Sequence, residues 1–176
     1  LAFEKLNPDA IVTNCSSCGE AWKHNYPQLF AEDPEMKPIA EKWAARTYDI
    51  SEFLIHKVPF RKDILGPVNR KVTYHDPCHL NRGQGINKEP REILKSIPGL
   101  ELVEMKKPDR CCGMAGSFYL VHPDLSYQIG EKKIADIAQT GTDTVVTGCP
   151  ACRLQLTSGV INAGLHDNVL HTVQIL

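Results

Sequence analysis

The sequence lacks the features that would place it in a membrane, in a secretory pathway or on nucleic acid. No apolar run approaches the roughly 20 residues that a membrane-spanning helix needs. Residues Leu1 to Asp9 have neither the basic start nor the apolar stretch of a signal peptide. The formal net charge is −1 and the lysines and arginines are scattered, so no basic patch is expected. We therefore expect a cytoplasmic protein that neither crosses a membrane nor binds nucleic acid.

Cysteine is too scarce for a small disulfide-stabilised scaffold. The chain has seven cysteines in 176 residues, well below the roughly 8–10% typical of such scaffolds, and the number is odd. Because reducing compartments keep thiols free, clustered cysteines there are more often metal ligands or redox groups. The 42% of apolar residues suffices for one core, or for one domain and part of a second.

One segment of the chain occurs twice. Asp9 to Cys18 reads DAIVTNCSSC, and Asp143 to Cys152 reads DTVVTGCPAC. In each copy a β-branched run typical of a buried parallel strand leads into Cys-x-x-Cys, where we expect a helix to begin. Three further cysteines precede the second copy and none precedes the first. We therefore predict a duplicated unit, with a C-terminal remnant of the first unit at residues 1–67 and a complete second unit at residues 68–176.

Strands and helices are expected to alternate between and after these copies. Strands are expected at 72–75, 100–104, around 145 and at 169–175, and helices at 90–97, 123–139 and 149–160. One more helix is predicted over 39–54, because Ile39, Trp43, Thr47, Ile50 and Leu54 recur at helical spacing. This alternation predicts an α/β fold with a mostly parallel sheet flanked by helices.

The cysteines are expected to converge in this fold. Cys15, Cys78 and Cys149 follow the ends of strands, and the Cys111–Cys112 pair follows another. Carboxyl ends of parallel strands meet at one edge of a sheet, where ligands bind. A helix N-terminus also favours the thiolate that binds metal. Adjacent cysteines suit a single tetrahedral ion poorly, whereas an extended cluster with several irons can use a fifth thiolate.

The spacing of five cysteines resembles that of the CCG domain, which occurs in heterodisulfide reductases, lactate-utilisation proteins and glycolate oxidase iron-sulfur subunits. The similar stretches are His75 to Leu80, Arg82 to Gly85, Asp109 to Gly113 and Thr147 to Pro150. The likeness covers Tyr74 to about Leu176, and residues 1–67 resemble the tail of a preceding CCG unit. It implies that the metal ligands are Cys78, Cys111, Cys112, Cys149 and Cys152.

The resemblance also implies a cofactor and partners. It implies a 4Fe-4S cluster, noncubane in heterodisulfide reductase, in an iron-sulfur electron-transfer subunit that is not catalytic alone. Its electrons would come from a flavoprotein subunit that holds FAD and oxidises glycolate or lactate, and partners could hold it at the inner face of the membrane. Members usually begin with a ferredoxin-like domain, whose Cys-x-x-Cys-x-x-Cys-x-x-x-Cys-Pro motif does not occur in this chain.

Alternative functions remain open at this point. Catalysis at the cluster, as in heterodisulfide cleavage, is one; a structural zinc site using four of the five thiols is another, and a metal-free interaction module is a third. Cys15 and Cys18 are further candidate ligands, but without partners from the first unit they could equally form a free dithiol or a disulfide.

Three residues beside the cysteines are candidates for cofactor binding. His79 could tune the metal centre or transfer a proton, and Arg82 could cradle an anion or lie solvated in a turn. Gly113, like Gly116, would let the backbone approach a bulky inorganic core. His75 could act in the same way as His79, but a hydrogen-bonded structural role is expected for it. The other histidines are expected on loops or surfaces: His24, His56, His122, His166 and His171.

Overall fold

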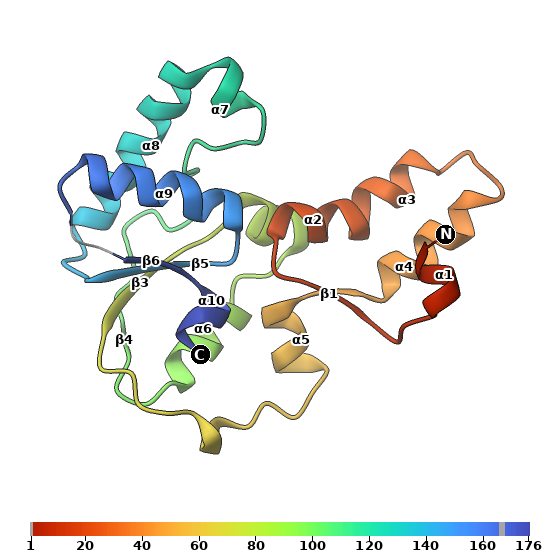
Figure 1. The fold of residues 1–176 in the computed structure, drawn as a ribbon, viewed down its shortest axis with the longest axis horizontal. Coiled ribbons are helices and arrows are strands. Elements are labelled where there is room, and N and C mark those ends of the chain that lie inside the picture. The colour runs from red at the N-terminus through yellow and green to blue at the C-terminus, as the bar shows by residue number, and fades with distance from the viewer. Residues whose placement is uncertain (1, 166–167) are drawn as a thin grey trace.

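Two parallel β-sheets with helices around them form the framework of the computed structural model, which describes residues 2–165 and 168–176 (Figure 1). The smaller sheet pairs β1 (Ile11–Thr13) with β2 (Thr47–Asp49). The larger has the strand order β4–β3–β5–β6, made by Glu101–Leu102, Lys71–His75, Thr144–Thr147 and Asn168–His171. Every pairing in both sheets is parallel, which confirms the predicted fold class.

The larger sheet is covered on both faces, which explains its β-branched central strands. On one face, α8 (Pro123–Ala138) and α9 (Pro150–Asn162) pack against Val145 and Val169. On the other face, α6 (Glu89–Ser96) and α10 (Thr172–Ile175) pack against Val72 and Val146. Consecutive side chains of a strand point to opposite faces, so Val145 and Val146 belong to different cores. The short helix α7 (Phe118–Val121) precedes α8.

The N-terminal third of the chain surrounds the smaller sheet. It contains α1 (Ala2–Leu6), α2 (Ser16–Glu20), α3 (Tyr26–Leu29), α4 (Met36–Ala45) and α5 (Ile50–His56). A π-helical turn at Ala21–Asn25 joins α2 to α3, a second lies at His79–Gly83, and a 3-10 turn lies at Lys62–Ile64. Figure 1 shows the first turns of α2 and α9 facing each other, and a buried hydrogen bond of 2.9 Å from Ser16 Oγ to the Gly148 carbonyl joins them.

The helix predicted over 39–54 is wrong. The chain leaves α4 after Ala45, and Thr47–Asp49 becomes strand β2 in register with Ile11–Thr13. A new helix then starts at Ile50, because Asp49 accepts a hydrogen bond from the Ser51 amide and Glu52 accepts one from the Asp49 amide. Such a capping box stabilises a helix N-terminus. The apolar spacing therefore runs across two helices and the strand between them.

The predicted last strand is also too long. It ends at His171, and Thr172–Ile175 forms α10. His171 caps this helix with its ring, accepting a hydrogen bond from the Val173 amide. The same order of elements thus occurs twice: a strand, a Cys-x-x-Cys helix start, a second parallel strand and a capped helix. The likeness between the two copies extends beyond the repeated segment of sequence.

Candidate metal centre

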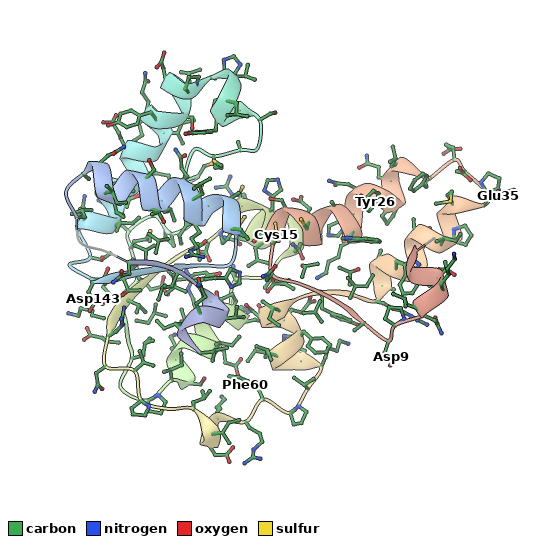
Figure 2. The ribbon with its side chains drawn as sticks, in the orientation of Figure 1. Asp9, Cys15, Tyr26, Glu35, Phe60 and Asp143 are labelled. Atoms are coloured by element: carbon green, nitrogen blue, oxygen red, sulfur yellow. The ribbon has the colours of Figure 1, made fainter. Side chains whose placement is uncertain are left out.

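Both Cys-x-x-Cys motifs sit at helix starts with the same backbone conformation. Cys15, between β1 and α2, has φ −132° and ψ 113°, and Cys149, between β5 and α9, has φ −139° and ψ 122°. Each cysteine is extended and immediately precedes its helix. Pro150 occupies the first position of α9, where the fixed φ of proline suits a helix. Figure 2 shows Cys15 where the N-terminal third of the chain meets the larger sheet. Each first cysteine therefore faces amides at the positive end of a helix.

Cys78 and the Cys111–Cys112 pair approach the same place from two other segments. Cys78 follows β3 and opens the π-helical turn, which Gln84 ties to α2 through a 2.8 Å hydrogen bond to the Ser16 carbonyl. The paired cysteines lie in the loop after β4. Lys133, fully buried on α8, fixes this loop by donating hydrogen bonds to the Lys107 carbonyl at 2.7 Å and the Pro108 carbonyl at 3.0 Å.

The seven thiols form one continuous set of contacts. Hydrogen-bonding contacts between side chains link them in the order Cys78, Cys111, Cys112, Cys152, Cys149, Cys15 and Cys18. All seven are free thiols. A small cavity of about 30 Å³ is lined by His75 and by Cys78, Cys111, Cys112, Cys149 and Cys152. The fold thus brings together cysteines from four separate segments: three follow strands of the larger sheet, and Cys15 follows a strand of the smaller sheet.

Hydrogen bonds among the thiols divide them into donors and acceptors. The pKa of Cys149 is lowered by hydrogen bonds from the thiols of Cys15 and Cys152 and from amides of α9. The pKa of Cys111 is lowered in the same way by Cys112 and Cys78, and the Gly113 amide donates to its sulfur at 3.3 Å. Donating to Cys111 raises the pKa of Cys112 to about 11. Neighbouring thiols and amides thus favour the thiolate, the form that binds metal, at Cys111 and Cys149.

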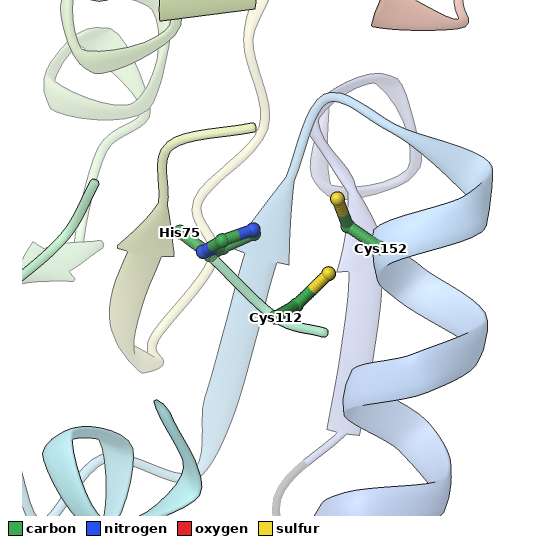
Figure 3. A group of neighbouring side chains, drawn as sticks. All are labelled: His75, Cys112 and Cys152. Atoms are coloured by element: carbon green, nitrogen blue, oxygen red, sulfur yellow. The ribbon is translucent and has the colours of Figure 1, made fainter. Parts of the chain in front are cut away.

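His75 lies against this set of sulfurs. One of its ring nitrogens and the Sγ atoms of Cys112 and Cys152 all lie within 4.8 Å of one another (Figure 3). The ring is fully buried, and neither nitrogen makes a hydrogen bond of ordinary geometry to a described residue, although the Pro108 backbone lies beside the ring. Burial and the nearby Lys133 charge lower the pKa of His75 to about 3, so the imidazole is neutral. The role of a hydrogen-bonded structural histidine therefore stays a prediction.

Comparisons with known proteins agree with this geometry. A family model described as the CCG cysteine-rich domain matches residues 72–157. Lactate utilization protein A of Lysinibacillus sphaericus is 31% identical over 175 residues, which cover 99% of this chain and 75% of that protein. The chain belongs to the CCG family. The resemblance seen in the sequence is thereby confirmed, and the matched residues include the five cysteines of the CCG spacing.

Two other CCG relatives are longer proteins. A fumarate reductase (CoM/CoB) subunit of Methanothermobacter marburgensis is 41% identical over 169 residues, covering 96% of this chain and 32% of the relative. A probable glycolate oxidase iron-sulfur subunit of Bacillus subtilis is 36% identical over 177 residues, covering 99% of this chain and 40% of the relative. The chain therefore spans only a third to two fifths of these two relatives.

The donors of this CCG chain fit a thiophilic centre. Soft thiolates select zinc, copper(I) and iron–sulfur clusters, whereas carboxylate and carbonyl oxygens suit magnesium and calcium. Five thiols from the second unit exceed the four donors of a tetrahedral ion, and Cys112, Cys149 and Cys152 are buried away from water.

The three other candidate residues occupy different places around the CCG cysteines. His79 lies at the edge, with Nδ1 3.4 Å from Cys78 Sγ and Nε2 3.5 Å from Glu20 Oε2. Arg82 points to solvent, 67% exposed, and pairs with Asp109 at 3.1 Å. Gly113 has a positive φ of +94°, and a Cβ there would lie 2.3 Å from the Ser126 carbonyl oxygen of α8. The backbone at Gly113 therefore lies close to helix α8.

The remaining histidines are mostly outside the site. His56 is exposed and pairs with Glu89 at 3.0 Å, whereas His166 lies outside the described residues. The expectation that His171 lies on a loop or surface is wrong, because this residue is buried at the end of β6. Its burial lowers its pKa, an effect that the backbones of Asn14 and Gly148 oppose. It therefore lies beside the residues that precede both Cys-x-x-Cys motifs.

Sequence reasoning also missed Lys133. A signal was present, because this lysine falls in helical register with the apolar residues Ile129 and Ile137 on the buried side of α8.

No helix formed by residues 2–165 or 168–176 is both long and apolar enough to cross a bilayer.

Proposed function

We propose that this chain is part of an iron–sulfur electron-transfer subunit. Its 4Fe-4S cluster would be held by Cys78, Cys111, Cys112, Cys149 and Cys152. Cys15 and Cys18 would lie next to the cluster as further candidate ligands. The observation that carries the proposal is the continuous contact among sulfurs that come from separate segments of the chain. Names of relatives support it, since one is an iron–sulfur subunit. A cluster bound here would accept and release single electrons.

Residues around the sulfurs would tune such a centre. The Gly113 amide donates a hydrogen bond to Cys111 Sγ, and His79 is within reach of Cys78 Sγ. Hydrogen bonds to sulfur and nearby positive charge make a cluster easier to reduce. Arg82 would act from the rim through its charge, weakened by Asp109 and by solvent.

The proposed partner is a flavoprotein subunit that holds FAD and oxidises a 2-hydroxy acid such as glycolate or lactate. Similarity to lactate utilization protein A and to a probable glycolate oxidase iron-sulfur subunit supports this choice. The chain would not be catalytic alone, and a ferredoxin-like domain of the longer protein would complete the electron path. We place the protein in the cytoplasm, held by its partners at the inner face of the membrane.

A second candidate is thiol–disulfide catalysis at a noncubane cluster, as in heterodisulfide reductase. The 41% identity to the fumarate reductase (CoM/CoB) subunit favours it, and Cys78 and Cys111 are accessible enough for a substrate to approach. A structural zinc site is a third candidate, favoured by the three donor atoms that His75, Cys112 and Cys152 place within 4.8 Å of one another.

Anaerobic reconstitution with iron and sulfide tests the proposal. We expect about four irons and four sulfides per chain, with a paramagnetic resonance signal on reduction. Cys112→Ser should lose this content while keeping its circular dichroism spectrum, and the matched variant Cys18→Ser, at the exposed end of the thiol series, should keep it. Unchanged iron and sulfide in Cys112→Ser would contradict the ligand assignment. Zinc without sulfide would favour the structural site, and turnover of disulfides the second candidate.

A further inference from the structure

We propose that His75 is a nitrogen ligand of the metal centre, beside Cys112 and Cys152, so that the centre has mixed sulfur and nitrogen coordination. The inference rests on the proposed function in requiring a metal at this place, and it adds a donor that the cysteine motif does not contain.

The first argument is the position of the ring. His75 is the last residue of β3, and its neighbour across the sheet is Thr147, two residues before Cys149. The strand therefore delivers the imidazole to the same edge as the sulfurs. Its ring nitrogen and the two Sγ atoms lie close enough together for one ion to contact all three (Figure 3).

The second argument is that the ring otherwise has unmet polar groups. Neither of its nitrogens makes a hydrogen bond of ordinary geometry to a described residue, although the side chain is only 1% exposed and the Pro108 backbone lies beside it. Buried polar atoms without partners are rare and usually mark an ion, a water or a function. His171, on β6, differs in part, because its Nδ1 accepts a hydrogen bond from the Val173 amide and caps a helix, while its Nε2 also lacks a partner among the described residues.

The third argument is the position of the Pro108 backbone, in the loop that leads to Cys111 and Cys112. Metal-binding histidines usually direct the second ring nitrogen at a carbonyl or carboxylate. The backbone of Pro108 lies beside the His75 ring and can take that role.

Cobalt binding tests this inference without any iron or sulfide. Co²⁺ would be titrated into the metal-free, reduced chain, its His75→Asn variant and the control His56→Asn, whose ring is exposed and paired with Glu89. We expect His75→Asn to weaken Co²⁺ binding at least about tenfold and to shift the visible absorption bands, while the control matches the wild type. Identical affinity and spectrum in His75→Asn, with an unchanged circular dichroism spectrum, would overturn the proposal.

A second measurement needs no variant. The wild-type chain, labelled with ¹⁵N-histidine and reconstituted anaerobically, should show the strong hyperfine coupling of a directly bonded nitrogen in pulsed paramagnetic resonance. A cluster that forms with only weak nitrogen coupling would overturn the role of His75 and leave the proposed function standing. Failure to form any cluster would count against the proposed function instead, and the cobalt titration would still decide for His75.

Discussion

Replacing Gly113 by alanine should destabilise the protein even without metal. The residue has φ +94°, and an added Cβ would lie 2.3 Å from the Ser126 carbonyl oxygen and 3.2 Å from the Gly130 amide nitrogen. Both atoms belong to the backbone of α8, so no side-chain rotation relieves the contact. A left-handed conformation costs an L-residue about 1–2 kcal/mol, and forced repacking about 1–3 kcal/mol more. We expect a total loss of about 3 kcal/mol.

Gly116 provides the matched control for this substitution. It lies three residues further along the same loop with φ +58°, and an added Cβ there would meet nothing within 4 Å. Gly116→Ala should therefore cost only about 1 kcal/mol. Urea and thermal unfolding of the reduced, metal-free variants measure the difference, which corresponds to about 4–8 °C in Tm for a chain of this size. Equal losses for the two variants would refute the reasoning that α8 requires this glycine.

Three further predictions concern charged groups. Burial raises the pKa of Asp49 to about 6, so its protonated form contributes stability at low pH that is lost as pH rises through 6. Relative to Asp49→Asn, the wild type should lose about 2 kcal/mol of unfolding free energy between pH 4 and 7. A difference in unfolding free energy between the two proteins that does not change with pH would contradict this. Arg91→Met should cost about 3 kcal/mol in urea unfolding, because it leaves the buried Asp76 carboxylate without its 2.7 Å partner; a loss below about 1 kcal/mol would argue otherwise. Lys133→Met removes a buried positive charge near Cys112 and should lower the midpoint potential of the reconstituted protein. Lys132→Met removes an exposed charge and should leave the potential unchanged. Equal midpoint potentials in the two variants would contradict this prediction.

Much of the architecture around the cysteines follows from local sequence. β-branched runs that end in Thr-Asn-Cys or Thr-Gly-Cys predict both the strands and the helix starts at Cys15 and Cys149, because strand, cap and helix signals coincide there. The meeting of distant cysteines follows from a single rule, that parallel strands end at a common edge. Contact between Cys15 and Cys149 could not be predicted in this way, since it depends on how β1 and α2 pack against the larger sheet.

The errors arise where a distant partner determines the local structure. Thr47–Asp49 is a strand because Ile11–Thr13 lies beside it, and helical periodicity cannot register that partner. The capping signal at Asp49 and Glu52 was present in the sequence and marks the new helix. The isolation of the His75 ring depends on the loop and the helix that cover it, so residue type alone could not distinguish a structural histidine from a ligand.

Anomalous diffraction at the iron edge, from crystals of the anaerobically reconstituted chain, tests the central claim most directly. We expect several iron atoms within bonding distance of Cys78, of the Cys111–Cys112 pair and of Cys149 and Cys152 together. A single ion bound by four of these sulfurs, or iron located elsewhere on the chain, would contradict it.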